Sequence, residues 1–229
     1  MRTIEWLTET NEVQLIDQRQ IPGCLEYLRI HNASEMADAI RSMAIRGAPA
    51  LGVAGAFGVA LEALAGRNLD ETEFILKVNN AAQLLTASRP TAVNLAWGVK
   101  RITTILDDSF LDQEQKIEKI VQTARDMAEE DIATNLRMAE FGASLIDDGD
   151  TIITHCNTGS LAAVDWGTAL GVIRYAHEHG KRIKLLVDET RPRFQGGRLT
   201  AWECQQYGIP FEVITDNMSG YFLRRGEVQ

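Results

Sequence analysis

This chain of 229 residues has few basic residues for its length and only three cysteines. It holds 23 Lys and Arg against 32 Asp and Glu, which gives a formal net charge of −9 at pH 7. Such a balance removes the basic surface that a nucleic-acid-binding domain needs, so nucleic acid is not an expected partner. The cysteines, Cys24, Cys156 and Cys204, are odd in number, widely spaced and without a neighbour at metal-ligand spacing. We therefore expect free thiols, as in the reducing cytoplasm.

The sequence also lacks a long apolar run. The most apolar stretch, Ala48 to Leu61, lies between Arg46 and Glu62, which leaves fifteen residues between these two charges. A helix that crosses a membrane needs about twenty apolar residues, so this run is too short and no membrane partner is expected. Its many small residues instead predict a helix that is buried on all sides. The first residues, Met1 to Trp6, are too polar for a signal peptide, so we expect a cytoplasmic protein.

The periodicity of apolar residues changes twice along the chain. Short β-like runs at Val13 to Ile16 and Leu25 to Ile30 predict a small sheet, and helical periodicity from about Ser34 to Ile146 predicts four or five helices. Beyond Gly149 the order is strand 151–154, helix 163–179, strand 183–187, helix 199–206 and strand 211–215. This βαβαβ order predicts a parallel, Rossmann-like sheet that looks unfinished. We expect an α/β protein with two domains: residues 1–148, a small β-sheet with a helical bundle, and residues 149–229, an α/β domain incomplete at its C-terminus.

Cysteine 156 stands where an apolar run enters a turn of small residues, Asn157 to Gly159. In open α/β sheets ligands bind beyond the carboxyl ends of the strands, so a thiol at this point indicates catalysis. The alternative is that Cys156 is a small core residue, the usual fate of a free cysteine. A second polar cluster, Asp188 to Arg198, follows the next predicted strand and holds three arginines, whose fork of donors suits phosphate or carboxylate. A solvated charged loop is the other interpretation.

Two arginines precede predicted helix starts. Arg46 comes before Gly47 and Pro49, and Arg89 comes before Pro90. Proline suits the first turn of a helix, and the free amides and dipole of that turn favour an anion. The repeated arrangement predicts a shared phosphate site, although each arginine alone could serve only to cap a loop.

Five motifs in this order resemble the family of methylthioribose-1-phosphate isomerases. They are Arg46 to Ala50, Ser88 to Asn94, Thr154 to Asn157, Glu189 to Pro192 with Gln195 and Gly196, and Leu199 to Glu203, followed by Thr215 to Met218. The wider family includes ribose-1,5-bisphosphate isomerases and regulatory subunits of the eukaryotic exchange factor for initiation factor two. The resemblance covers essentially the whole chain.

The resemblance implies an isomerase that converts 5-methylthioribose 1-phosphate into 5-methylthioribulose 1-phosphate in methionine salvage. It assigns the transfer of a proton between C2 and C1 to Cys156. It assigns substrate binding to five positions, Arg46, Gly47, Ala48, Arg89 and Gln195. It also implies a homodimer and no metal or nucleotide cofactor.

The sequence departs from the family pattern in one respect. The family's catalytic aspartate lies in a Gly-Ala-Asp-Arg motif, followed by an Asn-Lys pair that contacts substrate, and neither occurs in these 229 residues. We expect both to lie beyond Gln229, so that this chain is an N-terminal portion whose activity alone is open. Asp188 and Asp216 also follow predicted strands, but an aspartate there often only caps the next helix, and we do not assign them the role of the acid.

Two alternative functions stay open. A non-catalytic regulatory or sugar-phosphate-sensing module would keep the arginines but would not need Cys156. A ribose-1,5-bisphosphate isomerase would need a second phosphate site where methylthioribose carries its apolar group. Phe57, Trp97 and Trp166 could line an apolar pocket for that group, or could be plain core residues.

Overall fold

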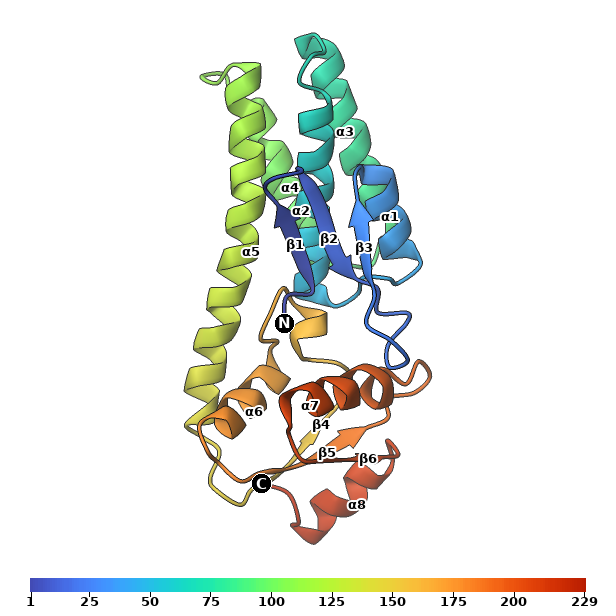
Figure 1. Cartoon of the computed structure of the whole chain (residues 1–229), viewed down its shortest axis with the longest axis vertical. Coiled ribbons are helices and arrows are strands. Elements are labelled where there is room, and N and C mark those ends of the chain that lie inside the picture. Colours follow the sequence, from blue (N-terminus) through green and yellow to red (C-terminus); the bar gives the residue numbers. More distant parts are fainter. The chain divides into compact units, whose positions relative to one another are not determined.

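The computed structural model describes residues 1–229 and divides into two compact units (Figure 1). The helical unit consists of Thr3–Arg19 and Glu26–Asp131, and the parallel-sheet unit consists of Met1–Arg2, Gln20–Leu25 and Ile132–Gln229. This division falls inside the long helix α5, Gln113–Ala143. The sequence-based boundary at residues 148 and 149 stays a prediction.

The helical unit contains an antiparallel sheet of three strands, β1 (Ile4–Leu7), β2 (Glu12–Ile16) and β3 (Tyr27–Ile30), in the order β1-β2-β3. The sequence predicted β2 and β3 but missed β1. Ile4 and Trp6 are buried while the residues between and after them are partly exposed, so β1 has the alternation of a strand with one covered face. Four residues are too few to show this alternation clearly in the sequence.

The predicted helices are confirmed. They are α1 (Ala33–Arg41), α2 (Ala48–Ala65), α3 (Glu71–Ser88), α4 (Val93–Thr103), which continues into a 3₁₀ turn at Thr104–Asp107, and α5. The carboxylate of Asp70 accepts the Glu73 amide at 2.9 Å, as its capping position requires. At 18 residues, α2 is longer than the predicted run and meets the length and composition of a membrane span. However, 72% of it is buried inside the protein, which is typical of a core helix.

Helices α2 and α4 approach each other through glycines. A Cβ atom built on Gly98 would lie 2.1 Å from the carbonyl oxygen of Gly52, and one built on Gly55 would lie 2.7 Å from a methyl group of Leu95. At Gly98 a side chain has no room, because one helix backbone lies directly against the other, whereas at Gly55 the close atoms belong to side chains. The apolar composition of α2 thus serves close helix packing.

The parallel-sheet unit contains β4 (Thr151–Thr154), β5 (Lys184–Asp188) and β6 (Phe211–Ile214), paired in parallel in that order. The predicted βαβαβ order is confirmed, and the helices are α6 (Ala169–Glu178), α7 (Ala201–Tyr207) and, after β6, α8 (Met218–Arg225). A π-helical turn, Gly196–Thr200, leads into α7. One hydrophobic cluster in the core of this unit consists of Leu170, Ile173, Ile183, Leu185, Val187, Cys204 and Ile209.

Helix α6 begins six residues later than predicted, at Ala169 instead of Ala163. A short 3₁₀ turn, Ser160–Ala162, precedes the intervening segment, and a bridge that joins Gly159 to Gly167 closes that segment into a loop. A Cβ atom on Gly167 would lie 2.2 Å from the Gly159 carbonyl carbon, and the φ of Gly167 is 86°. Only glycine fits this approach, and it closes the loop that follows β4.

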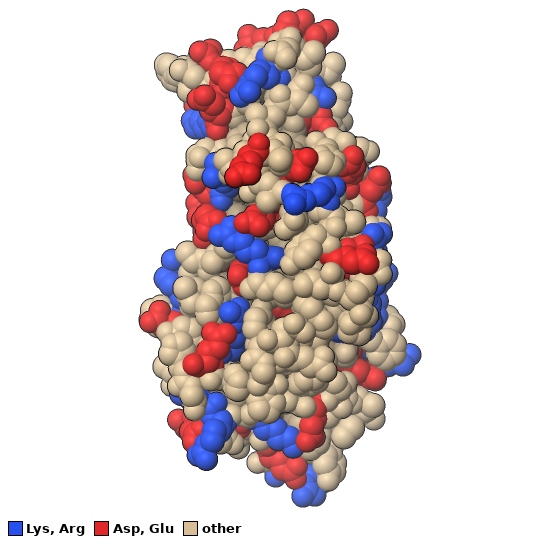
Figure 2. All heavy atoms as spheres, viewed as in Figure 1, with Lys and Arg blue, Asp and Glu red and all other residues tan.

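Positive and negative side chains are interspersed on the molecular face shown in Figure 2. Charged side chains of the helical unit form ion pairs, for example Arg101 with Glu130 at 2.6 Å and Arg67 with Glu114 at 2.8 Å. The face therefore carries mixed charge rather than one basic patch.

Candidate functional site

Cysteine 156 lies just after the carboxyl end of β4, with its side chain half-buried. Its φ is 69°, a left-handed conformation that costs free energy for any residue but glycine. Two hydrogen bonds hold it there: the Cys156 N–H donates to Thr190 Oγ1 at 2.8 Å, and the Cys156 carbonyl accepts from Thr200 Oγ1 at 2.8 Å. Strained residues persist where their surroundings fix them, and they gather at functional sites. The structure thus presents the thiol in a fixed orientation.

Glutamine 195 lies against this thiol. Its Nε2 donates to Cys156 Sγ at 3.3 Å, while its Oε1 is buried without a hydrogen-bond partner. A buried oxygen without a donor is rare in proteins, and a ligand hydroxyl would satisfy it. The structure therefore brings together two of the residues that the sequence singled out, one from the turn after β4 and one from the loop after β5.

Aspartate 216 organises the loop after β5. Its Oδ1 accepts from the Thr190 amide at 2.8 Å and its Oδ2 accepts from the Arg191 amide at 2.8 Å. These two backbone donors lower the pKa of Asp216 below its usual value, and the Arg191 amide has the larger effect. Asp216 thus holds Thr190, which in turn holds the Cys156 amide. This contact gives Asp216 a structural role, consistent with leaving it unassigned as an acid.

Aspartate 188 ends β5 and is 4% exposed. It accepts a hydrogen bond from Ser219 and pairs with His155 Nδ1 at 2.9 Å. Ligand atoms of His155, Asp188 and Asp216 lie within 4.8 Å of one another, a spacing that a metal ion could bridge. Every carboxylate oxygen of the two aspartates already has a hydrogen-bond partner, however, so hydrogen bonding accounts for this cluster.

In the helical unit, Arg46 is half-buried just before α2. Gly47 has a φ of 99°, which only glycine adopts readily, and no side chain caps the amides of Ala48 and its neighbours. Pro49 is in the first turn of α2, as predicted. The start of α2 therefore offers backbone donors beside an arginine, which is the arrangement that binds anions.

Arginine 89 follows α3, and its Nη1 is buried without a hydrogen-bond partner. A buried guanidinium nitrogen lacking an acceptor is costly, and an anion would supply one. One detail of the prediction is wrong. Pro90 does not open a helix, because α4 begins at Val93 and Pro90 is exposed in the turn before it. The turn is closed by the Ala92 amide, which donates to the Arg89 carbonyl at 3.0 Å.

The aromatic residues considered for an apolar pocket have different surroundings. Phe57 is 1% exposed and packs on Trp6 with ring centroids 5.6 Å apart, so it is a core residue. Trp97 is 54% exposed. Trp166 is stacked under the Arg174 guanidinium, 4.1 Å from the ring centroid. Of the three, Trp97 alone is largely open to solvent.

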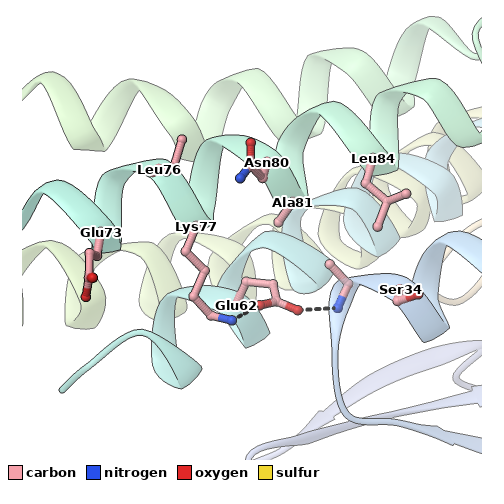
Figure 3. A pocket seen from close by; sticks show the side chains of 9 residues that line it. Ser34, Glu62, Glu73, Leu76, Lys77, Asn80, Ala81 and Leu84 are labelled. Carbon is pink, nitrogen blue, oxygen red and sulfur yellow. Dashed lines mark hydrogen bonds and ion pairs between the residues drawn. The ribbon is translucent and has the colours of Figure 1, made fainter. Parts of the chain in front are cut away.

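A cavity of about 410 Å³ in the helical unit contains none of the predicted site residues (Figure 3). Glu62 lies at its edge, where its carboxylate accepts the Ala33 amide at 3.0 Å and pairs with Lys77 Nζ at 2.7 Å. Glu62 thereby satisfies the first amide of α1, which is a structural task.

The three cysteines should differ in reactivity. Cys204 is fully buried, and desolvation raises its pKa to about 12, so at neutral pH it stays a thiol. Cys24 is exposed and Cys156 is half-buried. We expect iodoacetamide to modify Cys24 and Cys156 in the native protein and to leave Cys204 untouched, as read by peptide mass mapping. Rapid modification of Cys204 without unfolding would contradict the described packing of α7.

The sequence did not point to Thr190 and Thr200, which bind the backbone of Cys156, or to Glu203, which binds Asn157. They lie within motifs that carried the resemblance, but only the three-dimensional contacts give them a task. Motif membership was the single signal in the sequence that could have pointed to them.

Comparison with known proteins places these motifs in context. The model of the initiation factor 2 subunit family matches residues 44–229. A putative methylthioribose-1-phosphate isomerase from Methanosarcina acetivorans is 48% identical over 230 residues, which cover 100% of this chain and 65% of that protein. The methylthioribose-1-phosphate isomerase of Thermotoga maritima is 47% identical over 98% of this chain and 64% of its own length.

Solved structures agree on the fold. The 5-methylthioribose 1-phosphate isomerase of Pyrococcus horikoshii superposes with a TM-score of 0.92 at 39% identity, over 100% of this chain and 64% of that one. Translation initiation factor eIF-2B subunit delta from A. fulgidus gives a TM-score of 0.87 at 44% identity, over 100% and 66%. The chain thus spans about two thirds of the length of the relatives it matches.

Proposed function

Because the chain belongs to the initiation factor 2 subunit family, we propose that it serves an aldose–ketose isomerase that converts 5-methylthioribose 1-phosphate into 5-methylthioribulose 1-phosphate in methionine salvage. The observation that carries the proposal is the half-buried Cys156, held in a left-handed turn beside the Gln195 amide. A module that only senses sugar phosphates would need no thiol fixed in this way. Relatives of 44–48% identity that bear the isomerase name support the same conclusion.

The chemistry of this substrate explains the need for a thiol. Its anomeric oxygen carries phosphate, so the ring opens only when the bond from C1 to the ring oxygen breaks and that oxygen receives a proton. The Cys156 thiolate then takes the proton from C2, a double bond forms between C1 and C2, and the thiol returns a proton to C1 as the C2 hydroxyl becomes a carbonyl. A thiol suits both transfers because its reference pKa of about 8.5 is near neutrality. The Gln195 donor stabilises the sulfur while it is charged.

A second group must give a proton to the ring oxygen and take one from the C2 hydroxyl. By the family resemblance this is the aspartate of a Gly-Ala-Asp-Arg motif that these 229 residues do not contain. A turnover assay of the purified chain with 5-methylthioribose 1-phosphate, alone and completed with the remaining third of the Thermotoga maritima relative, tests this point. Turnover only by the completed chain would support the proposal, and no turnover by either would contradict it.

Arginine 46, Gly47, Ala48 and Arg89 are proposed to bind the substrate phosphate. The open amides at the start of α2 and the unpartnered Nη1 of Arg89 support this assignment. Gln195 is proposed to bind a sugar hydroxyl or a phosphate oxygen through its unpartnered Oε1. We further propose a Rossmann-like second domain, a cytoplasmic location and a homodimer, as the family resemblance implies.

Replacing Arg89 with alanine should weaken binding of 5-methylthioribose 1-phosphate by about 1.5 to 3 kcal/mol, the value of a charged hydrogen bond. Titration calorimetry on the chain would measure the change. Arg182→Ala is the matched control, because Arg182 is 86% exposed and pairs with Asp148 at the surface. Equal affinity of the Arg89 variant and the unaltered chain would return Arg89 to a structural role.

Two other functions make a different prediction for binding. A ribose-1,5-bisphosphate isomerase would prefer the bisphosphate, and a non-catalytic regulatory module would bind sugar phosphate without turnover. Competition between 5-methylthioribose 1-phosphate and ribose 1,5-bisphosphate for binding distinguishes the bisphosphate isomerase from the proposed enzyme. The proposal requires that the methylthio sugar compete better.

A further inference from the structure

Glutamate 203, on α7, is a fully buried carboxylate that the proposed reaction does not use. Four donors from the segment after Cys156 converge on it, one of which is the Ser160 amide. Asn157 Nδ2 donates to Oε1 at 2.8 Å, while Ser160 Oγ and the Leu161 amide donate to Oε2 at 2.7 and 3.4 Å. Desolvation raises the pKa of Glu203, and these hydrogen bonds oppose that rise. We call residues 157–161 the cysteine turn.

The cysteine turn fits tightly against this carboxylate. A Cβ atom on Gly159 would lie 2.3 Å from Glu203 Oε2, so the backbone of the turn lies directly on the carboxylate. On the other side, Ser160 Oγ is 2.9 Å from the hydroxyl of Tyr207, whose ring is stacked by Arg174. The turn therefore has little freedom while Glu203 accepts its donors.

Glutamate 203 connects to the thiol by a short route. Asn157, which it binds, is the residue next to Cys156, and Asn157 Nδ2 also lies 3.3 Å from Thr200 Oγ1. Thr200 in turn donates to the Cys156 carbonyl at 2.8 Å. Asn157 is 8% exposed, so water does not readily replace a lost partner.

We propose that Glu203 is a positioning residue for Cys156: its carboxylate fixes the cysteine turn and thereby keeps the Cys156 sulfur beside the Gln195 amide. The proposal rests on the proposed role of Cys156 as the proton-transfer group. A positioning role differs from a purely structural one in its effect on the thiol. If Glu203 were purely structural, replacing it would change the stability of the protein and leave the reactivity of Cys156 in the folded protein unchanged.

Alkylation of Cys156 by iodoacetamide tests the proposal without turnover. The background is Cys24→Ser, and the rate is followed by peptide mass mapping across neutral pH. Asn157→Asp places a second carboxylate against Glu203, which should expel the turn, separate the sulfur from its Gln195 donor and slow alkylation by about tenfold. Adding Glu203→Gln should rescue the alkylation rate to within about twofold of the parent rate. The side-chain NH₂ introduced by Glu203→Gln can donate to the carboxylate introduced by Asn157→Asp, and the side-chain oxygen introduced by Glu203→Gln still accepts from Ser160 and Leu161.

The control is Glu212→Gln, the same substitution at an exposed residue of β6 that pairs with Lys184. It should leave the rate unchanged, and thermal melts should confirm that each variant is folded. Alkylation of folded Asn157→Asp at the original rate, or no rescue by the double variant, would overturn the proposal. Should Asn157→Asp fail to fold, Glu203→Gln alone decides: a slower rate supports positioning, and an unchanged rate overturns it.

This experiment separates two failures. If Cys156→Ser keeps its turnover in the completed chain, the proposed role of Cys156 in proton transfer fails while the alkylation results still report on Glu203. If the rescue is absent but Cys156→Ser is inactive, only the positioning role of Glu203 is lost.

Discussion

Serine in place of Cys156 should reduce turnover of 5-methylthioribose 1-phosphate by about 100-fold to 10,000-fold, the range that one general acid–base group contributes. A serine hydroxyl does not ionise near neutral pH, so it cannot take the proton from C2. Substrate affinity should stay near that of the parent, because the proposed binding groups, Arg46, Arg89 and Gln195, are unaltered. The completed chain described above is the form to assay, with the Cys156 parent as its reference.

A second cysteine provides the control for this result. Cys24→Ser removes an exposed thiol to which the proposed reaction gives no role, and it should leave kcat and KM unchanged. Loss of turnover in Cys156→Ser accompanied by loss of binding would indicate a disturbed fold rather than a missing base. Full turnover by Cys156→Ser would remove the thiol from the mechanism.

The sequence predicted the elements of this protein better than the contacts between its loops. Strong periodicity located α2 and α3, and strands bounded by turn residues located β4, β5 and β6. Because parallel strands bring their carboxyl ends to one edge, the pattern also placed polar residues of two loops on the same side of the sheet. The contact of Gln195 with Cys156 follows from that arrangement.

The geometry around the thiol could not be predicted in the same way. Cys156 and Thr190 have φ values of 69° and 57°, which side-chain-bearing residues adopt rarely and only under tertiary constraint. The constraint comes from hydrogen bonds between residues 26 to 46 positions apart, such as Thr190 to Asp216 and Asn157 to Glu203. Local patterns contain no information on such pairs.

The late start of α6 has a comparable cause. The periodicity from Ala163 onward suits a helix, but the bridge between Gly159 and Gly167 holds that segment in a loop. Here a tertiary contact overrides local propensity, as it does often in folded proteins. The residues kept out of the helix in this way, 163–168, follow the cysteine turn and the 3₁₀ turn at Ser160–Ala162.

Alanine in place of Gly98 should destabilise the helical unit by about 3 kcal/mol or more, at the upper end of the cost of overpacking a core. The new methyl group would lie 2.1 Å from the Gly52 carbonyl oxygen, a backbone atom that cannot rotate away. The gain of about 1 kcal/mol from the higher helix propensity of alanine does not compensate for this overlap. The midpoint of thermal unfolding, followed by circular dichroism, should fall by about 10 °C for a chain of this size.

A graded series of glycine variants makes this expectation specific. Gly55→Ala meets methyl groups of Leu95 and Val99 at 2.7 and 2.9 Å, and since these side chains can shift, it should cost less than Gly98→Ala. Gly220→Ala, in α8, meets nothing within 4 Å and should leave the midpoint unchanged or raise it. Equal midpoints for all three variants would mean that α2 and α4 do not pack backbone to backbone. The expected order would instead show that the small residues of α2 are retained for close helix contact.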